Sequence, residues 1–207
     1  RQFCHYGKTI IGATEDGLIV RSDDVDDAQF TAISNSPKCR ILFAVGGMLI
    51  GANGSLSEGG TQIASGVDFW FSSNEHDYTG WIPSTLADPT NSVAAWGPLY
   101  SPAGAIVAGG ALGHRAVLYK RGSIFVGQYT GPIDKWLFDC VSESIGCVGP
   151  DALVVAQDRH WFCSGDNFYV FDGSRPVPIG DKLRDWFSAN TFAGEMPTMS
   201  GAYDPTH

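Results

Sequence analysis

Short runs of apolar and aromatic residues alternate with polar, glycine-containing turns along the whole chain. The clearest example is the stretch 151–180, where three such runs, 152–156, 160–164 and 168–172, are separated by turn-forming residues. Runs of about five β-branched or aromatic residues between Asp, Asn and Gly are typical of antiparallel strands joined by tight turns. The pattern therefore predicts a three-stranded meander. A sheet of this size buries too little surface to be stable alone, so we expect it to pack against further sheets.

Three further units of the same kind precede this meander. Most contain a hairpin whose turn carries glycine, which is a strong local signal for paired strands. The predicted strands and hairpins lie at residues 8–21 with a turn at Asp16-Gly17, 40–52 with a turn at Gly46-Gly47, 67–72, 104–109, 115–129 with a turn at 120–122, and 136–141. We therefore expect an all-β chain.

The hairpin turns recur at a roughly regular interval. They fall near residues 16, 46, 121 and 158, and are spaced by about 30, 75 and 37 residues. Antiparallel units repeating every roughly 35 to 40 residues are typical of β-propeller blades. On this period the longest interval holds a second, degenerate unit around 70–81, and 200–207 begins another unit. We predict a partial or divergent β-propeller with four-stranded antiparallel blades, and a β-sandwich is the alternative fold.

A single domain is expected to cover residues 1–207, either as one propeller or as a fragment or processed piece of one. The proline-rich stretch 82–103 predicts a long irregular connection on the surface.

A short helix is expected near residues 181–189. Leu183, Trp186 and Phe187 lie there at helical spacing, behind Asp181, a residue type that caps helices. We interpret this segment as an amphipathic linker between units.

The composition favours a turn-rich β protein. The chain has 26 glycines and 11 prolines among 207 residues, and only 17% of its residues are charged. A formal net charge of −9 argues against a protein that grips nucleic-acid phosphates, because such proteins present a basic face. The densest charge run, Asp23, Asp24, Asp26 and Asp27, lacks the ligand spacing of a calcium loop, so we interpret it as a solvated loop.

The cysteines do not indicate a metal or disulfide framework. They are odd in number and form no C-x-x-C pair: Cys4, Cys39, Cys140, Cys147 and Cys163. Reduced core residues are therefore expected. No run approaches the roughly 18 to 20 apolar residues of a membrane helix and no signal peptide is visible, so neither membrane insertion nor secretion is expected.

No motif indicates a catalytic, metal or cofactor site. The histidines are His5, His76, His114, His160 and His207, and none has metal-ligand spacing from another His or Cys; His160 beside Cys163 comes nearest to a cluster. The carboxylates available for a glycosidase pair are Asp68, Asp77, Asp88, Asp139, Asp151, Asp166 and Asp172, most of them at turns. The glycine-rich run 104–114 lacks the ending of a phosphate-binding loop, and its second half is interpreted as an ordinary loop. We interpret the six tryptophans as wedges between blades.

Several of these stretches together resemble a known family. The run GCVGPDALVVAQDRHWFCSGDNFYVFDGSRPVPIGDKLRDWF at 146–187 is similar to a segment of tail and head-completion proteins of tailed bacteriophages. In that segment an aromatic strand leads into a hairpin of the form G-x-D/N-x-F/Y-x-Y/V-F-D-G and then P-I-G. VDFWFSSNEHDYTGW at 67–81, RAVLYKRGSIFVGQYTG at 115–131 and GAYDPTH at 201–207 resemble other parts of the same proteins. The resemblance spans residues 67–207.

The resemblance implies a structural virion protein with no enzymatic activity and no cofactor. Such β-propeller proteins build the tail nozzle or the ring that retains or conducts packaged DNA below the portal, typically as homohexamers. The implied partners are further copies of the chain, portal and adaptor proteins, and other tail proteins, with double-stranded DNA passing unbound during ejection. We expect Asp23, Asp24, Asp26 and Asp27 to face the lumen or a subunit interface, where acidic groups would repel DNA. The stretch 82–103 is a second expected subunit contact. A carbohydrate-binding or glycoside-hydrolysing tail propeller is the alternative, and a cellular scaffold is a third.

Overall fold

The computed structural model describes residues 2–22, 29–83, 92–192, 194–204 and 206. The described chain forms four antiparallel sheets, each built from four strands that are consecutive in sequence. The first is β1 (Gln2–Tyr6), β2 (Thr9–Ala13), β3 (Ile19–Ser22) and β4 (Thr31–Ala32). The second is β5 (Lys38–Val45), β6 (Met48–Glu58), β7 (Thr61–Ser72) and β8 (Ala95–Pro98). The third is β9 (Ile106–Leu112), β10 (Arg115–Lys120), β11 (Ile124–Gly131) and β12 (Lys135–Ser142). The fourth is β13 (Leu153–Ala156), β14 (Arg159–Cys163), β15 (Phe168–Phe171) and β16 (Val177–Pro178).

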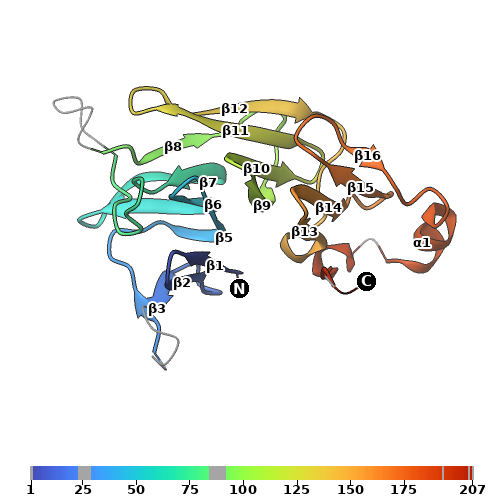
Figure 1. Cartoon of the computed structure of the whole chain (residues 1–207), viewed down its shortest axis with the longest axis horizontal. Helices are drawn as coiled ribbons and strands as arrows, with labels where there is room; N and C mark the ends of the chain where they lie inside the picture. Colours follow the sequence, from blue (N-terminus) through green and yellow to red (C-terminus); the bar gives the residue numbers. More distant parts are fainter. Residues whose placement is uncertain (1, 23–28, 84–91, 193, 205, 207) are drawn as a thin grey trace.

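The four sheets are the blades of a four-bladed β-propeller, as the spacing of the hairpins predicts. The first strands of the blades lie innermost, and β1 packs on β5, β5 on β9, and β9 on β13. Figure 1 shows the blades following one another around an arc, with β12 on its outer side. The β-sandwich alternative is therefore wrong, because the sheets pack as radial neighbours rather than as two facing layers.

Each pair of neighbouring blades shares its own apolar core. One cluster joins blades 1 and 2, a second joins blades 2 and 3, and a third joins blades 3 and 4. Strand β10 shows why: Ala116 and Leu118 pack in the second cluster, whereas Val117 and Tyr119 pack in the third. Since alternate side chains of a strand point to opposite faces, a strand buried on both faces reads as a continuous apolar run.

Polar side chains form hydrogen bonds between blades 3 and 4. His160 on β14 is fully buried; its Nε2 donates to the Ala111 carbonyl oxygen at 2.9 Å, and its Nδ1 accepts from the Tyr119 hydroxyl at 2.9 Å. Arg115 on β10 donates to the carbonyl oxygens of Asp172 and Gly173 beyond β15. His160 is therefore a structural residue in its neutral form rather than part of a Cys–His pair.

Side-chain hydrogen bonds to backbone groups also connect blade 1 to blade 2 and blade 2 to blade 3. The Gln2 side chain accepts from the Leu42 amide at 2.8 Å, and the Tyr6 hydroxyl donates to the Gly47 carbonyl at 2.6 Å. Asn53 of blade 2 donates to the Ile106 carbonyl of blade 3 at 2.9 Å. The bonds to Leu42 and Ile106 satisfy edge groups of the inner strands β5 and β9, and the bond to Gly47 holds the turn between β5 and β6.

Burial of His160 is expected to make the protein less stable in mild acid. Desolvation lowers the pKa of His160 below its usual value of 6.5, so below about pH 6.5 the unfolded chain binds a proton that the folded chain does not. The free energy of unfolding should stay level above that pH and fall by up to about 1.4 kcal/mol per pH unit as the pH drops towards 5. Urea titrations between pH 5 and 8 measure this. A His160→Gln variant should show a flatter profile, and an equally steep one would contradict the assignment.

The long interval between hairpin turns has a different origin from the predicted degenerate unit. Strands β6 and β7, of 11 and 12 residues, extend one blade, and residues 73–94, of which 84–91 lie outside the described residues, separate β7 from β8. The Asn74 side chain connects the two described ends of this segment, because its Oδ1 accepts from the Ser92 hydroxyl and from the Val93 and Ala94 amides. The prediction of an extra unit around 70–81 is therefore wrong.

The predicted irregular connection 82–103 is also only partly correct. It contains β8, the outermost strand of blade 2, which pairs with β7 from Phe69↔Pro98 to Ser72↔Ala95. A proline is tolerated there because the strand lies at a sheet edge. The prolines of this stretch suggested an irregular connection, so the short edge strand β8 was not predicted.

Near the C-terminal end, helix α1 (Arg184–Asn190) confirms the predicted position of a helix but not its cap or its amphipathic face. Leu183 is the N-cap, while Asp181 accepts from the Asn167 side chain at 2.8 Å. Only Phe187 of the three predicted apolar residues is buried; Leu183 and Trp186 are 57% and 66% exposed.

The predicted start of another unit at 200–207 is not seen. None of the described residues of 200–207 forms a strand, and Gly201 instead donates to the Asp151 carbonyl. No helix in the described part of the chain is long and apolar enough to cross a membrane.

Candidate ligand-binding pocket

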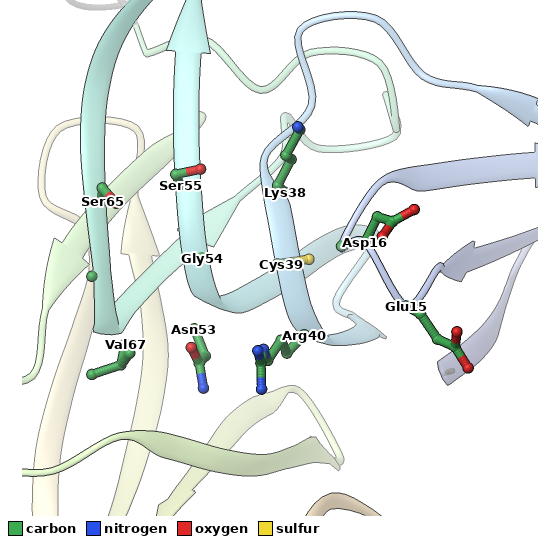
Figure 2. A pocket seen from close by; sticks show the side chains of 12 residues that line it. Glu15, Asp16, Lys38, Cys39, Arg40, Asn53, Gly54, Ser55, Ser65 and Val67 are labelled. Atoms are coloured by element: carbon green, nitrogen blue, oxygen red, sulfur yellow. The ribbon is translucent and has the colours of Figure 1, made fainter.

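A polar pocket of about 480 Å³ lies at the junction of blades 1 and 2 (Figure 2). One wall is the turn between β2 and β3, which carries Glu15 and Asp16. The other wall is the beginning of β5 with the facing parts of β6 and β7. The side chains drawn in Figure 2 include two cations, Lys38 and Arg40, which both come from β5.

Backbone hydrogen bonds fix the distance between these walls. The Cys39 amide donates to the Gly17 carbonyl at 2.8 Å, and the Gly17 amide donates to Thr14 within the turn. A Cβ on Gly17 would lie 3.1 Å from the Cys39 nitrogen, and its φ of +79° is one that L side chains rarely adopt. Glycine is thus what lets the acidic turn dock on β5.

The floor of the pocket is shaped by a bulge in β6. The register of β6 on β7 shifts between Ala52 and Gly54, and Asn53 has a φ of +56°. Gly54 pairs with Gly66 on β7, and a Cβ on Gly54 would lie 1.8 Å from the Lys38 carbonyl oxygen. The hairpin therefore bends where glycine allows β6 to approach β5, and this bend opens the pocket.

Polar side chains form a row across the three strands above the bulge. Lys38 pairs with Ser55, and Ser55 pairs with Ser65. Directly opposed residues of antiparallel strands point to the same face, so this row presents one ammonium group and two hydroxyls together. Arg40 and Asn53 lie on the next row, nearer the bulge (Figure 2).

A second cavity, of about 620 Å³, lies between the inner strands of all four blades. Its lining is polar and apolar in about equal parts, and Asp151 is the one carboxylate among the described lining residues. Gly109 and Gly110 on β9 face it, so the second half of the glycine-rich run 104–114 is an inner strand up to Leu112 and not a loop. A Cβ on Gly109 would lie 2.7 Å from the Phe43 ring, which explains the small residue there.

The sequence-based binding residues cannot be assigned to either cavity. Asp23, Asp24, Asp26 and Asp27 lie outside the described residues, as does Asp88. The described acidic candidates are scattered, and no group of three or more described His, Cys, Asp or Glu residues is arranged to hold a metal ion.

Three of the six described candidate aspartates have local structural contacts. Asp77 accepts from the amide and hydroxyl of Thr79, and Asp172 accepts from those of Ser174, which lowers the pKa of each carboxyl. For Asp172 the hydrogen bonds from Ser174 are the main cause of the lowered pKa. For Asp77, desolvation by burial acts to raise the pKa, but the hydrogen bonds from Thr79 and the Gly80 amide outweigh it. Asp166 contacts Tyr169 and Arg184. The turn-capping interpretation therefore holds for these two aspartates, Asp77 and Asp172.

The cysteines are free thiols, and three of them are buried: Cys39, Cys147 and Cys163. Burial raises the pKa of Cys4, Cys39 and Cys147 to about 12. A thiol that stays protonated at neutral pH is a poor nucleophile, so these residues act as small core side chains.

No family model matches the chain, and no curated protein matches it. The pocket residues were missed by sequence reasoning because they form no motif. The one available signal was the alternation of Lys38, Cys39, Arg40 and Ile41, in which charged residues occupy alternate positions at the start of an otherwise apolar strand.

Proposed function

We propose that the chain is a structural component of a tailed-phage virion, part of a tail nozzle or head-completion ring that retains or conducts packaged DNA. The support is the architectural role of the residues behind the resemblance. The stretch 165–173, G-D-N-F-Y-V-F-D-G, supplies the turn before β15, the strand itself and the Asp172 turn whose carbonyl accepts from Arg115 of blade 3. Residues that define the likeness thus hold blades 3 and 4 together.

The size of the central cavity bears on the path that DNA would take. The central cavity has the volume of a small-molecule site, since such sites span roughly 300 to 1,000 Å³, and it belongs to one chain. Duplex DNA would therefore pass along the axis of a ring of copies and not through a single propeller. The net charge of −9 suits a wall that repels phosphate.

Ring formation is the test of this proposal. Mass photometry of the full-length protein, alone and mixed with its portal and adaptor proteins, should show a closed oligomer of defined copy number on the portal. Mass spectrometry of purified particles should find the protein in the tail. A chain that stays monomeric with the portal and is absent from particles would overturn the proposal.

A glycan-binding tail propeller is the second candidate function. The observation that favours it is the polar pocket around Arg40, which combines hydroxyl, amide, cationic and acidic groups. Glycoside hydrolysis has less support, because that reaction uses two carboxyl groups that flank one bond. The two carboxylates of the polar pocket, Glu15 and Asp16, lie on the same wall, and the central cavity supplies only Asp151 among its described lining residues.

A further inference from the structure

We propose that the pocket around Arg40 binds an acidic saccharide unit, a sugar ring that carries a carboxylate. This inference rests on the second candidate function, glycan binding, and names its ligand class. It does not depend on ring assembly, because every wall of the pocket belongs to the same chain.

The two β5 cations are available for an anionic group. Within the ranges that the structure describes, the side chains of Lys38 and Arg40 form no hydrogen bond or ion pair with protein groups. By contrast, Lys120 and Lys135 donate to backbone carbonyls, and Arg115 ties two blades together. Figure 2 shows the Arg40 and Lys38 side chains pointing in opposite directions from β5, so they would not hold one group together. A guanidinium group alone binds a carboxylate through two parallel hydrogen bonds. Arg40 is therefore the expected anchor of the carboxylate.

The rest of the lining fits hydroxyl groups better than a bare anion. Ser55 and Ser65 both donate and accept hydrogen bonds, and the Asn53 side chain is held in place by its bond to the Ile106 carbonyl. Asp16 on the opposite wall would repel a second anionic group but accepts hydrogen bonds from hydroxyls. A ligand with one charged end and several hydroxyls satisfies both walls, whereas inorganic phosphate satisfies only one.

The pocket also offers an apolar side chain, Val67, against which the apolar face of a sugar ring could pack. Val67 on β7 lines the pocket and is 56% exposed, an unusual position for a valine at a strand centre. The volume of about 480 Å³ lies in the range of small-molecule sites, roughly 300 to 1,000 Å³. A monosaccharide unit at the end of a longer glycan can therefore enter.

The test uses a matched pair of ligands. The full chain is titrated with methyl β-glucuronide and with methyl β-glucoside. The two differ only at C6, where the first carries a carboxylate and the second a hydroxymethyl group. Binding is followed by calorimetry and by NMR of the pocket amides. The glucuronide should bind about tenfold more tightly than the glucoside, and its affinity should fall with added salt.

Variants locate the binding. Arg40→Gln should weaken glucuronide binding about tenfold and leave glucoside binding unchanged. Ser55→Ala should weaken both ligands. Arg175→Gln removes an exposed arginine outside the pocket and should change neither affinity. Melting curves of each variant show whether it is folded, and the ligand pair reports on the pocket in each folded variant.

The outcomes distinguish failure of the acidic-saccharide inference from failure of the glycan-binding function. Equal affinity for both ligands, or a glucuronide affinity that Arg40→Gln leaves intact, would overturn the acidic-saccharide inference. Failure of both ligands to bind would remove the glycan-binding function as well. Neither result bears on ring assembly, which is measured separately.

Discussion

Replacing Gly54 by alanine is expected to destabilise the protein by about 3 kcal/mol, which for a chain of this size lowers the melting temperature by about 6 to 12 °C. The new Cβ would lie 1.8 Å from the Lys38 carbonyl oxygen and 2.8 Å from the Cys39 Cα, and both are backbone atoms of β5. Side-chain rotation cannot relieve this overlap, so β5 and β6 must separate. The pocket between them should lose its shape, and glucuronide binding should disappear together with the stability.

The control for this variant is Gly122→Ala. A Cβ at Gly122 meets no atom within 4 Å, so the change in stability should stay within about 0.5 kcal/mol. Differential scanning calorimetry compares the two. A Gly54→Ala protein that melts within about 2 °C of the unaltered chain would show that β5 and β6 do not approach as described.

Replacing His160 by leucine is expected to lower the free energy of unfolding by about 3 kcal/mol at pH 7.5. The imidazole is completely buried, and from blade 4 it bonds across the interface to two groups of blade 3, the Tyr119 hydroxyl and the Ala111 carbonyl. Leucine fills a similar space but leaves both of these polar groups without a partner. Buried groups in that state cost about 1 to 3 kcal/mol each.

A double-mutant cycle with Tyr119→Phe tests this interpretation. Once the Tyr119 hydroxyl is removed, His160→Leu should cost about 1 kcal/mol less than in the unaltered chain. His114→Leu is the matched control, since His114 is an exposed turn residue, and its effect should be small. Additive effects at 119 and 160 would mean that the two side chains do not act on one another.

The sequence predicts the fold well where strands are apolar and turns contain glycine. In 151–180 the three predicted strands correspond to β13, β14 and β15, with shifts of one residue at their ends. The missed strands are β1, β4, β8 and β16. Three of these are outermost strands of two to four residues, and β1 alternates exposed and half-buried residues, so their stability comes from neighbours in the sheet and not from local pattern.

The pocket was less accessible to sequence reasoning than the blades. Asn53-Gly54 is a dipeptide typical of hairpin turns, yet here it bends a long strand, because β6 continues to Glu58 before the turn at Gly59-Gly60. Only the register of β6 on β5 and β7 brings Lys38, Ser55 and Ser65 into one row. Such pairings depend on a bulge whose position no local pattern specifies.

Because each blade is built from four consecutive strands, the blades can fold one after another during synthesis. Each hairpin joins residues close in sequence, so a blade can form soon after its own segment leaves the ribosome, before the distal half of the protein exists. Each of blades 1 to 3 then needs only its immediate successor to cover its exposed face. Nascent blade 2 should remain incomplete for longest, because β8 is synthesised only after residues 73–94. A chaperone that captures exposed apolar faces would bind best at that stage of translation.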